Sequence, residues 1–294
     1  MNADTLTTVV LETGGADPDI SQTDLFRHVL NDTTFGLSLY VNIALAGVAL
    51  LLFLFLARNL RDPRSQLIVV SVMAASAVSI ASYSGLASGL TLDIIQMPEG
   101  HALAETTTVL EPGGDETDGT IVMWGRALGW AVSMPFILLA LGLLAGSNIT
   151  KIATAIGSTT AAMLMVMVAA LTTSNYLFRW WWYALGVVFF LVTIYILLVE
   201  WPEDAKAAGT SDIVTLVKWI TVITLFGFFI TWALGTEGTA VIESVTLTSW
   251  IFSVLDIAAT YIVGLLVVLW TVNNTDIVSG GRTYGATSDA IPAD

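Results

Sequence analysis

Seven stretches of the chain are almost entirely apolar, and short polar breaks separate them. A helix needs about 20 apolar residues to cross the hydrocarbon core of a bilayer. Backbone polar groups in lipid must be paired within the segment, so each stretch is predicted to be a helix rather than a strand. The pattern therefore predicts an all-α membrane protein, a bundle of seven transmembrane helices. The predicted spans are residues 36–57, 66–91, 121–144, 152–171, 177–200, 214–235 and 246–272.

The polar parts of the chain divide it into three regions. Residues 1–34 are predicted to be an acidic external segment, residues 35–273 the seven-helix domain, and residues 274–294 an internal tail. Two loops stand out between spans. Residues 92–120 should form an outer loop with a short hairpin around Pro112-Gly113-Gly114, and residues 202–212 should form an inner loop.

The distribution of lysine and arginine predicts the orientation, because loops on the cytoplasmic side carry an excess of both. With the N-terminus outside and the C-terminus inside, only Arg27 and Arg179 lie outside, and Arg126 lies within a span. The opposite orientation would invert this bias. The cations then placed inside are Arg58, Arg61, Arg64, Lys151, Lys206, Lys218 and Arg282.

Composition excludes several classes of function. Only 12% of the residues are charged, against about 25% in soluble domains. The chain has no cysteine and only two histidines, His28 and His101, so thiol chemistry and a metal site are not expected. A net charge of −14 argues against nucleic acid as a partner and fits a high-salt habitat. No nucleophile–base constellation or phosphate loop indicates an enzyme.

Two charged residues stand out because charges inside a span are rare and costly. Arg126 lies a few residues into the third span, and Asp256 lies inside the seventh. One interpretation is a structural ion pair between two helices, or an arginine that reaches the outer interface. The other is an ion path or the remains of a chromophore counter-ion. Because the spans offer neither residue another ionic partner, we predict that the two side chains approach each other.

Several motifs resemble those of the microbial rhodopsins of archaea, and halorhodopsin most closely. The resemblance is collinear from about residue 24 to residue 272. It implies a bacteriorhodopsin-like bundle in the cell membrane, spanning the lipid bilayer several times, and a homo-oligomer, in this family a trimer. The motifs are WGRALGWAVSMP at 124–135, RWWWY at 179–183, WALGTEG at 232–238 and LDIAATY at 255–261.

The seventh span departs from the family at the residue on which its photochemistry depends. The family holds retinal as a Schiff base on a lysine four residues after the aspartate, on the same helix face and about 6 Å away. In this chain the aspartate is Asp256 and the lysine position is Thr260. A hydroxyl cannot form an imine. The chain has only three lysines, 151, 206 and 218, and all are predicted near the cytoplasmic side.

The retinal pocket that the resemblance implies is also altered. The family's sixth helix carries a tryptophan followed by Tyr-Pro three residues later, and these positions are Leu225, Phe228 and Phe229 here. Two tryptophans that match retinal contacts remain, Trp130 and Trp232. Tyr83 is the further candidate for the lining of the pocket.

The ion-handling positions are changed as well. A proton pump of this family has carboxylates at the positions of Gly129 and Ala140, so proton pumping is not expected. Halorhodopsin has a threonine at the first of these positions and a serine four residues later, and this chain keeps only Ser133. Without the Schiff base, Arg126 and Asp256 cancel, and a chloride there would be a costly uncompensated ion. Weak chloride binding is therefore the expectation.

Three functions remain open from the sequence. The first is an opsin homologue without a covalent pigment, which acts in binding, assembly or regulation and takes retinal or a carotenoid non-covalently, if at all. The second is a light-driven chloride pump, the usual role of the relatives that it resembles. The third is a photosensor with a partner transducer, for which the sequence shows no distinct surface.

Overall fold

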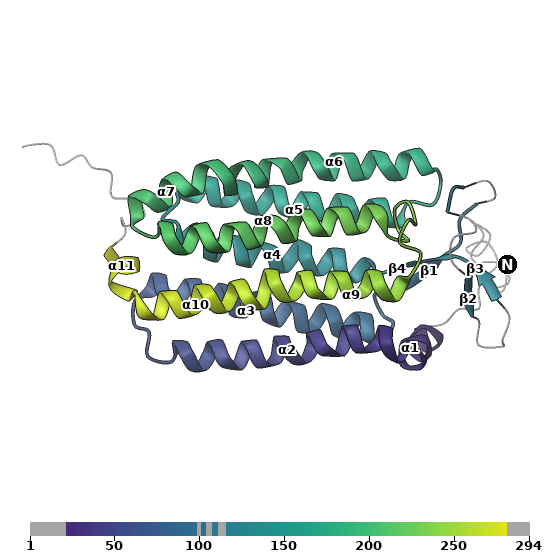
Figure 1. The fold of residues 1–294 in the computed structure, drawn as a ribbon, viewed down its shortest axis with the longest axis horizontal. Coiled ribbons are helices and arrows are strands. Elements are labelled where there is room, and N and C mark those ends of the chain that lie inside the picture. The colour runs from purple at the N-terminus through teal and green to yellow at the C-terminus, as the bar shows by residue number, and fades with distance from the viewer. Residues whose placement is uncertain (1–21, 99–100, 104–107, 111–115, 281–294) are drawn as a thin grey trace, which may run out of the picture.

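The structure is a computed structural model that describes residues 22–98, 101–103, 108–110 and 116–280. Within these residues, seven helices are long and apolar enough to cross a membrane, which confirms the predicted bundle. They lie side by side along one common direction (Figure 1). The first five crossing elements are α2 (Thr33–Ala57), α3 (Pro63–Ala87), α4 (Trp124–Leu144), α5 (Ile149–Leu171) and α6 (Tyr176–Tyr195).

Two of the crossing helices are interrupted by π-helical turns. Helix α6 continues through η2 (Ile196–Glu200) into α7 (Trp201–Ala208). The sixth crossing helix is α8 (Ser211–Leu234). The seventh is α9 (Val245–Asp256), which continues through η3 (Ile257–Ile262) into α10 (Val263–Asn273). A π-helical turn inside an α-helix inserts one extra residue and is frequent at functional sites.

Several helices begin at a short polar residue in the break before the span, and the side chain of that residue caps the first helical turn. Asp62 accepts a hydrogen bond from the Ser65 backbone N–H at 2.7 Å, and Asn148 accepts one from the Lys151 N–H at 2.9 Å. Ser244 does the same for the Leu247 N–H at 3.1 Å. Short polar side chains at these positions satisfy backbone donors that the first helical turn leaves unpaired.

The prediction of an inner loop at residues 202–212 is wrong for most of this range. Residues Trp201–Ala208 form helix α7, and only Gly209 and Thr210 separate it from α8. Pro202 lies at the start of α7, directly after η2, where the π-helical turn already interrupts the regular pattern of α-helical hydrogen bonds. The helix ends where Gly209 adopts φ 74°, a left-handed conformation that glycine takes without strain.

The predicted outer loop contains two pairs of short antiparallel strands. Strands β2 (Thr108–Leu110) and β3 (Glu116–Asp118) form a hairpin around the predicted turn, whose residues 111–115 lie outside the described residues. Strand β1 (Asp93–Ile95) pairs with β4 (Thr120–Val122), which the sequence analysis placed partly in the third span. The second span likewise ends at Ala87 rather than residue 91.

Two short helices were not predicted. Helix α1 (Gln22–Asn31) precedes the first span, and α11 (Thr275–Gly280) follows the last. Figure 1 shows α1 at the same end of the bundle as the strands, with α7 and α11 at the opposite end. Helix α4 lies at the centre, since 72% of its most apolar stretch is buried against 28% for α2.

Candidate functional site

The two charges that the sequence singled out meet inside the bundle. Arg126 lies in the first turn of α4, and Asp256 is the last residue of α9, directly before η3. Arg126 Nη1 lies 3.9 Å from Asp256 Oδ2, and both side chains are buried. The predicted ion pair is therefore confirmed. Each charge compensates the other, as a buried ion requires.

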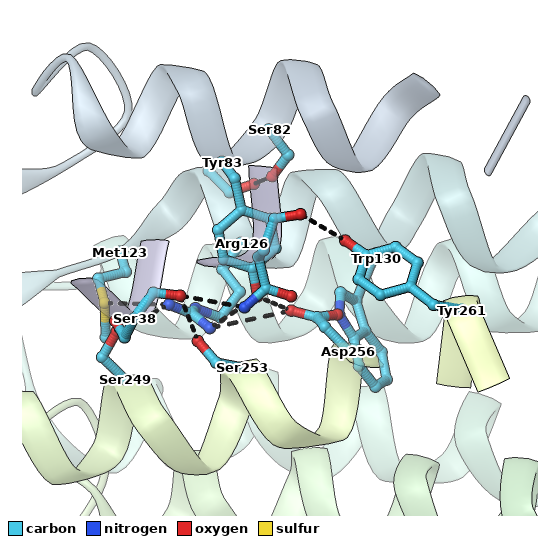
Figure 2. A network of polar contacts seen from close by, with 12 residues as sticks. Ser38, Ser82, Tyr83, Met123, Arg126, Trp130, Ser249, Ser253, Asp256 and Tyr261 are labelled. Atoms are coloured by element: carbon cyan, nitrogen blue, oxygen red, sulfur yellow. Dashed lines mark hydrogen bonds and ion pairs between the residues drawn. The ribbon is translucent and has the colours of Figure 1, made fainter. Parts of the chain in front are cut away.

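Two further side chains hold the Asp256 carboxylate. The Tyr83 hydroxyl donates a hydrogen bond to Oδ2, and the Trp130 Nε1–H donates one to Oδ1 (Figure 2). Arg126 Nη1 in turn donates to the Tyr83 hydroxyl at 3.2 Å. Both carboxylate oxygens are thus paired by donors from α3 and α4. Hydrogen bonds to a charged carboxylate are among the stronger ones in proteins.

Arg126 is fixed from several sides. Its Nη2 donates to Ser249 Oγ at 3.1 Å and lies 3.8 Å from Met123 Sδ. Its guanidinium carbon lies 5.4 Å from the ring centroid of Tyr83 and 5.0 Å from that of Phe252. Cation–π contacts of this kind add to the hydrogen bonds when the cation is out of water.

A chain of polar contacts continues from Arg126 into the interface between α2 and α9–η3. Ser38 Oγ lies 2.7 Å from Ser249 Oγ, and the Ser38 carbonyl accepts from both Ser253 Oγ and Asn42 Nδ2 at 3.0 Å. The Tyr261 hydroxyl then donates to the Asn42 carbonyl at 3.3 Å. Figure 2 shows Ser38, Ser249, Ser253 and Tyr261 around Arg126 and Asp256. The network joins three helices around the ion pair.

Thr260 lies in η3, one helical turn beyond Asp256. Its side chain is 1% exposed, and its hydroxyl has no hydrogen-bond partner among the described residues. The lysines are elsewhere. Lys151 Nζ is paired with Glu200 at 2.8 Å and Asp204 at 3.0 Å. Lys206 lies in α7, and Lys218 lies in the N-terminal third of α8, the part of that helix that follows α7.

Gly129 has a packing role that its sequence context does not reveal. A Cβ atom at this position would lie 2.3 Å from Ser82 Oγ, so a side chain cannot be added without movement. Ser82 belongs to α3 and donates to the Gly125 carbonyl of α4 at 2.8 Å. Gly129 thus lets α3 approach α4 closely. Ser133 is buried one turn further along α4, and no hydrogen bond links it to the ion pair in the described part of the chain.

The space beside Trp130 is taken by Phe228. Their rings stack with centroids 4.4 Å apart and an angle of 29°. Phe228 also packs against Phe252, at 5.1 Å between centroids. Because Phe252 lies over the Arg126 guanidinium, these aromatic rings join the ion pair to helix α8.

Two other candidates for the pocket stack on aromatic rings of α6. Trp232 stacks on Tyr183 at 4.9 Å and 12°, on the side of the bundle formed by α6. Phe229 stacks on Phe190 of α6 at 4.5 Å. Leu225 is fully buried. The two tryptophans implied by the resemblance therefore stack on different rings, Trp130 on Phe228 and Trp232 on Tyr183.

A second buried charged group was missed. Arg179, expected on the outside, is fully buried at the start of α6, where its Nε donates to the Glu237 carbonyl at 2.7 Å. Its Nη1 donates to the carbonyls of Ala170 and Thr172 at the end of α5. The Glu237 carboxylate accepts from the Met123 N–H at 2.8 Å, and burial raises the pKa of Glu237. Both residues lie near predicted span ends, where a sequence gives no sign of burial.

The described residues contain no group of three or more histidine, cysteine, aspartate or glutamate side chains that could hold a metal ion. The site itself consists of one ion pair, its hydrogen-bond donors and the aromatic rings of Phe252 and Phe228.

Comparison with known proteins agrees with this geometry. The sequence profile of the bacteriorhodopsin-like proteins matches residues 33–274. The chain belongs to the bacteriorhodopsin-like family. Within this family it is 50% identical to the halorhodopsin of Natronomonas pharaonis over 276 residues, which cover 94% of each chain. It is 46% identical to the halorhodopsin of Halobacterium sp. (strain SG1), over 96% of each chain.

Solved structures give the same result. A structure described as halorhodopsin, a light-driven chloride pump, superposes with a TM-score of 0.77 at 41% identity, covering 84% of this chain and 99% of the other. A bromide-bound halorhodopsin from Halobacterium salinarum superposes with a TM-score of 0.77 at 40% identity, covering 86% and 99%. The protein is thus a halorhodopsin-like, multi-pass membrane protein whose helix bundle contacts the lipid bilayer.

Proposed function

We propose that this halorhodopsin-like protein forms no covalent retinal pigment and acts in the membrane through binding, assembly or regulation. The observation that carries the proposal is Thr260. This residue lies four positions after Asp256, where the family resemblance places the Schiff-base lysine. An imine requires an amine, and the threonine side chain ends in a hydroxyl and a methyl group. The residues at this position therefore do not fit covalently held retinal.

The positions of the three lysines support the proposal. The predicted distance from the membrane surface to the bundle centre is about 15 Å, half the hydrocarbon thickness. A lysine side chain has four methylene groups and cannot cover that distance without backbone movement. Lys151 is moreover held by Glu200 and Asp204. No lysine of the chain is placed to substitute for residue 260.

The charge balance of the site gives independent support. Asp256 is paired with Arg126 and accepts hydrogen bonds from Tyr83 and Trp130. A protonated imine would bring one further positive charge, which an anion could balance. Without it the site is neutral, and a bound chloride would have no counter-charge. A buried ion without compensation costs several kcal/mol, so any chloride binding here is weak.

The test is addition of all-trans retinal to the purified apoprotein, followed by an absorption spectrum, borohydride reduction and mass spectrometry. The expected result is no red-shifted band and no retinyl adduct on any lysine. A visible band together with an adduct would overturn the proposal. Thr260→Lys is the restoring variant and Thr260→Met the matched control, because methionine offers a long side chain without an amine. A pigment in the first variant alone would identify the missing amine as the cause.

The second candidate is a light-driven chloride pump. The observation that favours it is the 41% identity to a structure described in those words. Proteoliposomes that contain a chloride-sensitive dye separate the two functions. Light-dependent chloride movement by the unmodified protein with retinal would establish the pump, whereas an unchanged signal in light and dark agrees with a protein without photochemistry.

A role in assembly can be tested by measuring the oligomeric state directly. The resemblance implies a homo-oligomer, a trimer, which we carry over as part of the proposal. Mass determination in nanodiscs or by light scattering in detergent tests this assignment separately from the pigment experiment.

A further inference from the structure

Helix α1 has two apolar sides, and only one of them packs against the bundle. Leu25 and Val29 are 6% and 1% exposed, so this side is the buried one. The contact is close. A Cβ at Gly36 of α2 would lie 2.5 Å from the Val29 carbonyl oxygen. A Cβ at Gly89, just after α3, would lie 2.9 Å from the Gln22 carbonyl oxygen. Helix α1 is thus fixed across the ends of α2 and α3.

The second apolar side consists of Phe26 and Leu30. They are 38% and 48% exposed although both are large hydrophobic residues. Residues four apart in a helix lie on the same face, so the two side chains are neighbours. At about 100° per residue this face lies roughly 100° around the helix from the buried one. The two side chains form a small apolar strip along one side of α1.

The position of α1 shows what covers it. Only Asp32 separates α1 from α2, and the lipid-facing side chains of α2 begin at Leu37 and Tyr40, which are 52% and 41% exposed. Asp32 fixes this junction, because its carboxylate accepts from the Phe35 N–H at 2.9 Å and from Thr246 Oγ1 at 2.9 Å. Figure 1 shows α1 directly at the end of α2. Its exposed apolar side therefore adjoins the part of the bundle surface that the bilayer already covers.

We propose that α1 is an interfacial membrane anchor, with Phe26 and Leu30 inserted into the boundary between headgroups and acyl chains. A helix of this kind lies in the plane of the membrane with its apolar side about 5–10 Å deep in that boundary. The two side chains that make the contact are apolar, so it does not depend on attraction to anionic headgroups. The partner is the lipid interface, reached through apolar side chains, and the contact is insensitive to salt.

The absence of cysteine from the chain allows a direct test. Single cysteines at Phe26, Leu30 and Asn31 are labelled with a nitroxide in the full-length protein, reconstituted into phosphatidylcholine–phosphatidylglycerol vesicles. Asn31 is the control on the same helix, because it is exposed and polar. Leu37→Cys gives the reference for a lipid-facing site. Collision rates with oxygen, which concentrates in lipid, and with a water-soluble nickel complex are then measured by electron paramagnetic resonance.

Labels at Phe26 and Leu30 are expected to collide several-fold more often with oxygen than with the nickel complex, at a depth between those of Asn31 and Leu37. The order is expected to stay the same when the salt concentration is raised. Nickel accessibility at residues 26 and 30 equal to that at residue 31 would overturn the proposal, since these side chains would then face water. Low accessibility to both reagents with dipolar broadening would also overturn it, because a second copy of the chain would then cover α1.

Discussion

Arg126 and Asp256 lie 3.9 Å apart inside the bundle, and both side chains are buried. Replacing one member leaves a buried charge without compensation, which costs about 3–5 kcal/mol. We expect Asp256→Asn to lower the stability of the protein strongly. The double variant with Arg126→Gln should lose less than the sum of the two single losses. The measurement is a double-mutant cycle of unfolding in mixed micelles.

The control for this cycle is the pair of Lys151 and Glu200, whose side chains are 26% and 29% exposed. A pair of such exposure is screened by water and typically contributes no more than about 1 kcal/mol. Its coupling energy should therefore be much smaller. Equal coupling in the two cycles would contradict the assignment of the central pair as the buried one.

Gly129 should tolerate no side chain as long as Ser82 faces it. A Cβ at Gly129 would lie 2.3 Å from Ser82 Oγ and 2.8 Å from Ser82 Cβ. We expect Gly129→Ser to destabilise the protein by about 1–3 kcal/mol, the usual cost of overpacking. In the background of Ser82→Gly the same substitution should cost less. Gly157→Ala on α5 is the matched control, because its Cβ would meet nothing within 4 Å. Thermal unfolding in detergent measures all four variants.

Glu237 should make stability depend on pH in a defined direction. Burial raises its pKa above the ordinary 4.5, so the folded protein holds the proton more tightly than the unfolded chain. The stability that it contributes is full at low pH and is lost as the pH rises from below 4.5 through the raised value. Glu237→Gln removes this dependence and keeps the acceptor for the Met123 N–H.

The stability of Glu237→Gln relative to the unmodified protein should therefore increase from about pH 3.5 to pH 7, since ordinary carboxyl groups titrate near pH 4.3. Apparent melting temperatures across this range give the comparison. Glu243→Gln is the control in the same loop, where the side chain is exposed. A difference that shrinks as the pH rises would refute the assigned direction.

The orientation of the bundle remains a prediction that cysteine labelling can test. We expect the N-terminal end outside, because the cytoplasmic side should carry the excess of lysine and arginine. Gln22→Cys and Ser279→Cys place exposed thiols at opposite ends of the bundle. A membrane-impermeant maleimide applied to intact cells should label residue 22 and leave residue 279 unlabelled until the cells are lysed. Labelling in the opposite order would invert the topology.

The seven crossing helices and the ion pair could both be predicted from the sequence. Span length follows from membrane thickness, and few charges interrupt the spans, so the pairing of Arg126 with Asp256 had few competitors. The extension of α6 through η2 into α7 could not be read from the sequence. Trp201-Pro202 was interpreted as a turn, and only the structure shows that the helix continues past Pro202 by way of the π-helical turn η2. Helix α1 is too short to give a span signal.

Other parts of the site depend on which helices approach each other, which no local pattern encodes. From the sequence, Gly129 is only the position at which a side chain found in the family is missing. In the bundle, the missing side chain makes room for Ser82 of α3. Arg179 lies at a span end and resembles an interfacial cation, yet it is fully buried because the end of α5 and the Glu237 carbonyl surround it. Both facts arise from contacts between segments distant in the chain.

The pairing of Arg126 with Asp256 also determines how the centre of this protein responds to voltage. A unit charge that moves across a membrane gains or loses about 2.3 kcal/mol per 100 mV. Two opposite charges 3.9 Å apart form a short dipole with no net charge. The membrane potential exerts almost no net force on such a pair, so the field neither pulls the centre toward one face nor performs work on it when the two residues move together. The buried pair therefore contributes almost no gating charge, and its depth in the bundle should be the same in a resting and an energised membrane.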